Sequence, residues 1–263
     1  MLRPASLRPS IRAAFLTTFS VLGLTAALSS VQTALADEPG HVHWAYRGPH
    51  DAAHWSEIDP DFKGCKTGHQ QSPIDIRHAV QADLPPLEWD YRPSPATVIN
   101  NGHTLQVNLS QAGALLLDGE RFELQQFHFH TPSEERVNGR SHPLEAHLVH
   151  RNASGELAVL AVFIDQGASN TGLQAVFDHL PAKAGETQAL ASPLQVSDWL
   201  PASRRYYRYR GSLTTPPCSE GVRWQVLQQP ITASAQQIRA FQRLYPFNAR
   251  PIQPLHDRKI EAN

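Results

Sequence analysis

Two short segments carry histidines at a spacing that can bind a metal ion. The first is QQFHFH at 125–130, and the second is EAHLVH at 145–150. Side chains alternate along a strand, so His128 and His130 would share one face while the phenylalanines beside them point the opposite way. If the second segment is a neighbouring strand, His147 can complete a set of three ring nitrogens. Three histidines with one open position are the pattern of a catalytic zinc.

Hydrogen-bond acceptors accompany two of these histidines. Gln126 precedes His128 by two positions, and Glu145 precedes His147 by two. Each pair lies on one face of its predicted strand, and a metal-bound histidine usually donates its second ring N–H to such an acceptor. The alternative is a set of core histidines satisfied by backbone groups, which is the commoner fate of a single histidine. On the strand argument alone both interpretations stay open.

Other histidines lack this support. The HVH segment at 41–43 repeats the spacing of residues 128–130, but no acceptor pattern or partner strand is evident near it. His50, His54 and His69 are equally isolated. We interpret all of these histidines as non-ligands, so the H-x-H spacing by itself does not define a metal site.

The elements that must position these residues are mostly strands. Many short alternating runs are rich in β-branched or aromatic residues and are separated by Gly, Asn or Pro, which is typical of strands and turns. They lie at 97–100, 103–109, 114–118, 122–130, 144–151, 156–165, 206–213 and 222–230. Helical patterns occur at 171–180 and at 234–245, where Ser234 is suited to be the N-cap. The sequence predicts a single mainly β (α+β) domain, built on a large, twisted, mostly antiparallel sheet of about ten strands with short surface helices.

The first 36 residues do not fit this pattern. They combine a start with three arginines, an uncharged apolar stretch at 13–31 and ALA at 34–36, which is the arrangement of a cleavable signal peptide. A permanent N-terminal membrane anchor is the alternative, because the apolar stretch is about long enough to span a bilayer. We expect cleavage after Ala36, which leaves 37–263 as one periplasmic or secreted domain without a membrane contact.

The charge and the cysteines of the segment 37–263 are informative. Without the three leading arginines it carries 20 basic and 24 acidic side chains, a formal net charge of −4. This balance gives no electrostatic footprint for nucleic acid. Two cysteines, Cys65 and Cys218, favour one disulfide if the chain is exported, and the alternative is two free buried thiols.

Eight motifs, in order along the chain, resemble the successive motifs of the α-class carbonic anhydrases. They are HWAY (43–46), QQSPIDI (70–76), NNGHTLQV (100–107), QFHFHTPSEE (126–135), EAHLVH (145–150), LAVLAVF (157–163), GSLTTPPCSEGVRW (211–224) and NARPIQP (248–254). The short HTPSEE connection and the pair Cys65 and Cys218 resemble the secreted bacterial branch, in which a disulfide at this place is usual. The resemblance covers nearly all of 37–263 and implies a catalytic domain that reversibly hydrates carbon dioxide to bicarbonate and a proton.

The resemblance also implies a role for individual residues. His128, His130 and His147 match the ligands of one Zn²⁺ per chain, whose bound hydroxide attacks carbon dioxide. Gln126, Glu145 and Asn248 match residues that orient these ligands, Glu134 and Thr214 match the pair that orients the hydroxide, and His103 matches the proton shuttle. Tyr46 and Asn101 match residues that order water, and Val149, Val159, Leu213, Thr215, Val222 and Trp224 match the substrate pocket.

Two departures from the family pattern and three rival functions remain. Glu135 stands where many family members have histidine, and Thr131 stands in place of a tryptophan; we assign no catalytic role to Glu135. The rivals are a binding module on the same fold, a zinc hydrolase of another kind and metal storage by the N-terminal histidines. The sequence leaves the rate, the inhibitor preference and the oligomeric state open, although secreted bacterial members are often homodimers.

Overall fold

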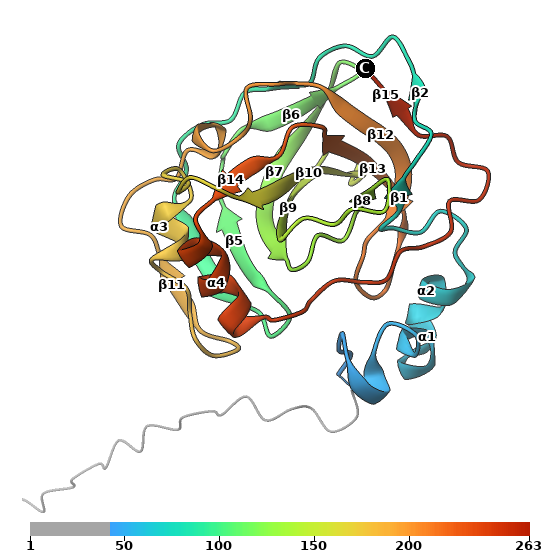
Figure 1. Cartoon of the computed structure of the whole chain (residues 1–263), viewed down its shortest axis with the longest axis horizontal. Helices are drawn as coiled ribbons and strands as arrows, with labels where there is room; N and C mark the ends of the chain where they lie inside the picture. Colours follow the sequence, from blue (N-terminus) through green and yellow to red (C-terminus); the bar gives the residue numbers. More distant parts are fainter. Residues whose placement is uncertain (1–42) are drawn as a thin grey trace, which may run out of the picture. The chain divides into compact units, whose positions relative to one another are not determined.

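The computed structural model describes residues 43–263, and the predicted signal peptide at 1–36 lies outside the described residues. Within the described part, no helix is both long enough and apolar enough to cross a membrane. Strands dominate this part of the chain, and helices are few and short (Figure 1).

One large sheet of thirteen strands forms the centre of the fold, and two further strands pair separately. The strands are β1 (Asp75–Ile76), β2 (Val80–Gln81), β3 (Glu88–Trp89), β4 (Ala96–Asn100), β5 (Leu105–Leu109), β6 (Ala114–Leu117), β7 (Glu120–His130), β8 (Arg136–Val137), β9 (Leu144–Arg151), β10 (Leu157–Gln166), β11 (Thr187–Ala189), β12 (Tyr206–Ser212), β13 (Glu220–Leu227), β14 (Ile231–Ala233) and β15 (Glu261–Ala262). The main path of the sheet runs β11-β4-β5-β7-β9-β10-β13-β12-β15-β2. Strand β14 pairs with β10, and β6 joins β3 to β7, while β1 pairs with β8 on its own.

The helices are single turns or little more, with one exception. They are the 3₁₀ segments η1 (Gly48–His50), η2 (Pro60–Lys63) and η3 (Val196–Asp198), and the α-helices α1 (Trp55–Ile58), α2 (Gly64–Thr67), α3 (Gln174–Phe177) and α4 (Ala235–Leu244). Helix α4 begins at a capping box, in which Ser234 and Gln237 each bond the other's backbone N–H. Helices α3 and α4 lie next to each other (Figure 1).

Strands β7 and β9 are central because each is paired on both sides. They run antiparallel, with His128 opposite His147 and Phe127 opposite Leu148. Strand β7 also pairs with β5, and β9 with β10. Because side chains alternate along each strand, this register collects the three histidines on one face and the apolar partners on the other.

The two faces of this sheet have different cores. On one face Phe127, Phe129 and Leu148 are fully buried in the larger hydrophobic cluster, which also receives Phe241 from α4. Burial of each such side chain contributes roughly 1.5–3 kcal/mol, which fixes the strands that carry the histidines. A smaller cluster that includes Val159 lies on the histidine face.

The predicted fold class is confirmed, with three differences in detail. The sheet has thirteen strands and not about ten, because strands of two or three residues such as β2 and β14 are too short for an alternating pattern to be read. The helix predicted at 171–180 is reduced to α3. Strand β5 begins at Leu105, since the Asn101 side chain accepts hydrogen bonds from the backbone N–H groups of His103 (3.0 Å) and Thr104 (2.9 Å) and holds them in a turn.

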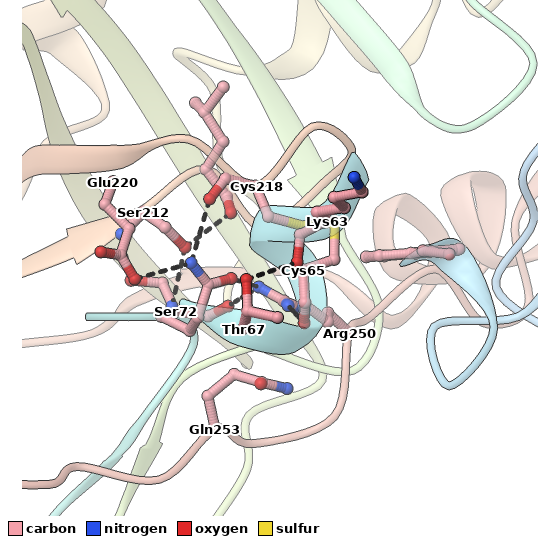
Figure 2. The surroundings of a disulfide bond; sticks show 12 residues. Lys63, Cys65, Thr67, Ser72, Ser212, Cys218, Glu220, Arg250 and Gln253 are labelled. Carbon is pink, nitrogen blue, oxygen red and sulfur yellow. Dashed lines mark hydrogen bonds between the residues drawn. A yellow bond between two sulfur atoms is a disulfide. The ribbon is translucent and has the colours of Figure 1, made fainter. Parts of the chain in front are cut away.

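The cysteines form the predicted disulfide between α2 and the loop before β13. Cys65 and Cys218 are joined across a separation of 153 residues, with 5.0 Å between their Cα atoms. Beside them the Arg250 guanidinium donates hydrogen bonds to the carbonyl oxygens of Cys65 (2.9 Å) and Ser72 (2.7 Å), as Figure 2 shows. The segments that contain α2, Cys218 and Arg250 are therefore held together by a covalent bond and by a buried cation.

Candidate metal centre and active-site cavity

Three histidines converge on one point above strands β7 and β9. The ring centroids are 5.0 Å apart for His128 and His130, 5.5 Å for His128 and His147, and 4.5 Å for His130 and His147. One ring nitrogen from each lies within 4.8 Å of those of the other two. His130 and His147 are buried, and His128 is half-buried. This spacing suits a small cation that three imidazole nitrogens bind together.

The other ring nitrogens of two ligands are bound by this chain. Nδ1 of His128 lies 2.9 Å from Oε1 of Gln126, and Nδ1 of His130 lies 2.8 Å from the backbone carbonyl of Asn248. These acceptors leave Nε2 of each ring directed toward the common point. Nε2 of His130 is buried and has no hydrogen-bond partner among the described residues. An unpartnered buried nitrogen is costly unless something binds it, so the donor set fits a metal ion such as zinc.

The third histidine has two carboxylates at its second nitrogen. Nε2 of His147 is 3.4 Å from Oε2 of Glu135 and 3.5 Å from Oε2 of Glu145. Both acids are fully buried. Nδ1 of His147 is thus the atom left for a metal, in contrast to the Nε2 atoms of the other two ligands.

The pKa values of the three histidines differ because their neighbours differ. Burial, with a smaller contribution from His147, lowers the pKa of His128 to about 3. Burial, with smaller contributions from His147 and His128, also lowers the pKa of His130 well below its ordinary value. Burial also acts to lower the pKa of His147, but the carboxylates of Glu135 and Glu145 outweigh it and raise that pKa to about 10. At neutral pH His128 and His130 therefore present neutral imidazoles, which is the form that binds a metal.

A buried acid lies behind the cavity. Oε1 of Glu134 accepts a hydrogen bond from the backbone N–H of Arg250 at 2.7 Å, and Thr214 lies close enough for its hydroxyl to lower the pKa of this carboxyl group. Burial has the larger effect and raises the pKa of Glu134 to about 7. The structure therefore brings together the two residues that the family resemblance paired.

A cavity of about 180 Å³ opens above the three histidines. The predicted residues Val149, Val159, Leu213, Thr215 and Trp224 all line it, as do Tyr46 and Asn101. Val222 is not among the residues that line the cavity: it is buried in the hydrophobic cluster that contains the lining residues Val159 and Trp224. The difference arises because membership of an apolar strand does not tell which side chains meet the open space.

His103 also lines the cavity, but its ring is stacked against two aromatic rings. Its centroid is 3.6 Å from that of Trp44 and 4.5 Å from that of His43, with nearly parallel planes. Burial, and then the nearby His43, lower the pKa of His103 to about 4. An ordinary histidine has a pKa near 6.5, so the ring in this stack takes up a proton less readily than a free histidine does.

Sequence reasoning missed several residues of the site. Trp44, Thr104 and Gln106 line the cavity and had been given no role. Arg250 was also missed, although its backbone binds Glu134 and its side chain binds the segment next to the disulfide. Trp44 could have been noticed within HWAY, but no sequence signal connects Arg250 to Glu134, since 116 residues separate them.

Comparisons with known proteins agree with this geometry. A family model described as eukaryotic-type carbonic anhydrase matches residues 50–263. A carbonic anhydrase of Pectobacterium carotovorum is 49% identical over 220 residues, which are 83% of this chain and 90% of that protein. A carbonic anhydrase of a Nostoc species is 44% identical over 227 residues, which are 83% of this chain and 85% of that protein.

Solved structures give the same answer. The α-carbonic anhydrase of Thermovibrio ammonificans, in complex with the inhibitor sulfanilamide, superposes with a TM-score of 0.82 at 44% identity, over 84% of this chain and all of that one. The α-carbonic anhydrase of Photobacterium profundum gives a TM-score of 0.79 at 49% identity, over 83% and 100% of the two chains. Fold and site define a β-sheet enzyme with a three-histidine centre. This chain belongs to the α-carbonic anhydrase family.

Proposed function

We propose that this protein is a zinc carbonic anhydrase that interconverts carbon dioxide with bicarbonate and a proton. The observation that carries the proposal is the convergence of His128, His130 and His147 beneath an apolar-walled cavity. The buried, unpartnered Nε2 of His130 supports a bound cation at this point. A zinc ion held by three histidines lowers the pKa of a coordinated water to about 7 and so supplies the nucleophile at neutral pH.

The cavity wall suits carbon dioxide, which has no charge for a site to bind. Val149, Val159 and Trp224 present apolar surface next to the histidines, and Leu213 extends this wall. Burial of apolar surface is the interaction that such a substrate can make. The wall thus holds the substrate close to the metal centre without a charged contact that would retain the product.

Thr214 and Glu134 orient the nucleophile in this proposal. If the Thr214 hydroxyl donates to the Glu134 carboxylate, its oxygen can only accept a hydrogen bond from the cavity side. An attacking oxygen must then turn its hydrogen toward Thr214 and its free lone pair toward the substrate. The backbone N–H of Arg250 holds Glu134 in place at 2.7 Å.

His103 carries the proton out in this proposal. While it is stacked on Trp44 its pKa of about 4 is too low for it to hold a proton at neutral pH. We therefore assign proton transfer to a His103 ring that has left the stack on Trp44 and turned toward the open space of the cavity, which Tyr46 and Asn101 also line. Rotation of the ring would then be part of each turnover.

The test is carbon dioxide hydration by the purified protein before and after zinc is removed. We expect one zinc per chain, activity that a chelator abolishes and that added zinc restores, and inhibition by a sulfonamide. Stoichiometric zinc without hydration would contradict the proposal and would favour a binding module, while hydration without any metal would contradict the role of the three histidines.

We further infer that the protein works outside the cytoplasm. The disulfide between Cys65 and Cys218 supports an oxidising compartment, which fits the predicted cleavage after Ala36. We also propose that a leader is cleaved on export, which mass spectrometry of the exported protein would test. A homodimer in solution is a further proposal, which sedimentation would test.

A further inference from the structure

Two buried carboxylates compete for one hydrogen atom. When His147 offers Nδ1 to a metal, its Nε2 carries a single hydrogen, and Oε2 atoms of Glu135 and Glu145 lie 3.4 and 3.5 Å from that nitrogen. The sequence spacing favoured Glu145, because it lies two residues before His147 on the same strand. The distances alone do not separate the two acids, so their other hydrogen bonds must decide.

The Oε2 atom of Glu145 is already used. It accepts hydrogen bonds from the backbone N–H of Glu134 at 2.8 Å and from the backbone N–H of Glu135 at 3.1 Å. A carboxylate oxygen has two lone pairs, so these two donors fill it. Glu145 thus holds the backbone at 134–135 in place, and it has no free acceptor site on the oxygen that faces His147.

On Glu145 the buried oxygen without a partner among the described residues is Oε1, whereas on Glu135 it is Oε2, the atom that lies 3.4 Å from Nε2 of His147. This atom is buried and has no hydrogen-bond partner within the described residues, while Oε1 of the same side chain accepts from the Tyr209 hydroxyl at 2.8 Å. An unpartnered buried carboxylate oxygen is costly. The Nε2–H group of His147 is the donor in reach of it, and a small movement of either ring or carboxylate would close the 3.4 Å gap.

The carboxylate of Glu135 is in turn fixed by a chain of hydroxyls. Tyr209 lies 3.1 Å from the Ser72 hydroxyl, which accepts from the backbone N–H of Ser212 at 3.1 Å. The Ser212 hydroxyl donates to the carbonyl of Leu213 at 2.8 Å. Leu213 directly precedes Thr214, so the same chain of contacts connects the third histidine to the loop that bears the threonine of the site.

We propose that Glu135 is the positioning residue for His147, and that it accepts the Nε2–H hydrogen bond which the spacing argument assigned to Glu145. Glu145 instead fixes the backbone that carries Glu134 and Glu135. Glu135 touches neither substrate nor metal and acts through His147 alone. This inference rests on the proposed function, since it supposes that His147 binds a metal through Nδ1.

The test compares substitutions at the two acids in the zinc-loaded protein. Loss of an outer-shell acceptor typically lowers metal affinity by about 10- to 100-fold. We expect Glu135→Leu to lose at least about tenfold in zinc affinity, measured by competition with a chelator. Glu135→Gln keeps a carbonyl oxygen as acceptor and should restore most of that affinity. The matched control, Glu145→Gln, should lower the melting temperature but change zinc affinity less than Glu135→Leu does.

A second measurement covers the case in which Glu135→Leu does not fold. In the zinc-loaded protein the Nε2–H proton of His147 should give a separate NMR resonance, because it is buried and hydrogen-bonded. Glu135→Gln should shift this resonance more than Glu145→Gln does. The proposal is overturned if Glu145→Gln causes the larger shift or the larger loss of zinc affinity, or if both variants at 135 bind zinc as the parent does.

These outcomes stay separate from those of the proposed function. If the parent protein binds zinc but does not hydrate carbon dioxide, the proposed function fails while the zinc affinities still decide between Glu135 and Glu145. If the parent does not bind zinc, the proposed function fails and this inference fails with it. If the parent hydrates carbon dioxide but the variants at 135 bind zinc as tightly as the parent does, this inference alone is overturned.

Discussion

Strand β9 carries two buried histidines on opposite faces, and their ring nitrogens have different hydrogen-bond partners. His147 faces the cavity. Two carboxylates lie near its Nε2, and its Nδ1 points toward the other two histidine rings. His150 faces the core, where the Tyr91 hydroxyl lies 2.8 Å from its Nε2 and the carbonyl of Ala158 lies 3.3 Å from its Nδ1. Burial is the same for both residues, so the number of ring nitrogens left without a partner distinguishes a ligand from a satisfied core histidine.

The largest expected effect comes from removing each histidine in turn. His147→Ala should abolish stoichiometric zinc binding and reduce carbon dioxide hydration by about a thousandfold or more, because a ligand of the metal is lost. His150→Ala should keep the zinc but lower the free energy of unfolding by about 2–4 kcal/mol, since it opens a cavity and leaves the Tyr91 hydroxyl unpaired. Metal analysis and hydration assays measure the first effect, and urea unfolding measures the second. If His150→Ala loses the metal, the distinction between a ligand histidine and a core histidine is wrong.

The disulfide provides the next test, because it constrains the loop on the cavity side of the sheet and not the hydrophobic core on the other side. Closing a loop of 153 residues stabilises the protein by about 5 kcal/mol at most in the chain-entropy model. Cys218→Ser should therefore lower the urea midpoint strongly. Hydrogen exchange should rise first near Thr214 and Thr215, since the Cys218 N–H bonds the carbonyl of Thr215.

The core side should show little early change in the same experiment. Phe127 and Phe129 are held by apolar packing that the disulfide does not touch. A uniform rise in hydrogen exchange over both faces of β7 would contradict the view that the two sides are stabilised separately.

The pH dependence of stability sharpens the comparison at His150. Burial lowers the pKa of His150 to about 4, below its ordinary value of 6.5. The unfolded state therefore binds a proton first, so stability is complete above pH 6.5 and is lost as the pH falls toward 4. The loss reaches about 3 kcal/mol at pH 4 from this residue. Replacement by the non-titrating His150→Phe should flatten this part of a pH series of urea unfolding, and an unchanged slope would show that other groups cause the acid loss.

The smallest expected effect concerns His103. Trp44→Ala removes the ring on which His103 is stacked at 3.6 Å and exposes it to water. Because burial is the main cause of its low pKa of about 4, that pKa should rise toward 6.5. An NMR titration of the His103 ring protons measures this rise, with His103→Ala used to assign the resonance. A pKa that stays near 4 would mean that the stack is not the cause.

The main fold and the metal triad could be predicted because both rest on short-range patterns. Alternation in QQFHFH and EAHLVH puts His128, His130 and His147 on the correct faces without any tertiary knowledge, and the observed register only had to align two strands. The Gln126 contact was also local, since it lies two residues before its histidine.

The remaining features depend on contacts that sequence spacing does not encode. Which of two acids serves His147 depends on where the backbone N–H groups at 134–135 point. The same is true of Val222, whose strand was correctly placed but whose side chain packs against its neighbours in the cluster and does not line the cavity. The stack on His103 depends on a segment some sixty residues earlier, and its lowered pKa had no sequence signal.

Asn248 has a consequence for the order in which the site can be assembled. Its carbonyl receives His130, and its side chain donates to the backbone carbonyls of His103 at 3.1 Å and Phe129 at 2.9 Å. These contacts are supplied more than a hundred residues after the strand they support. A ribosome must therefore translate the chain as far as Asn248 before this carbonyl can orient His130, and we expect the site to gain its full affinity for zinc only late in synthesis.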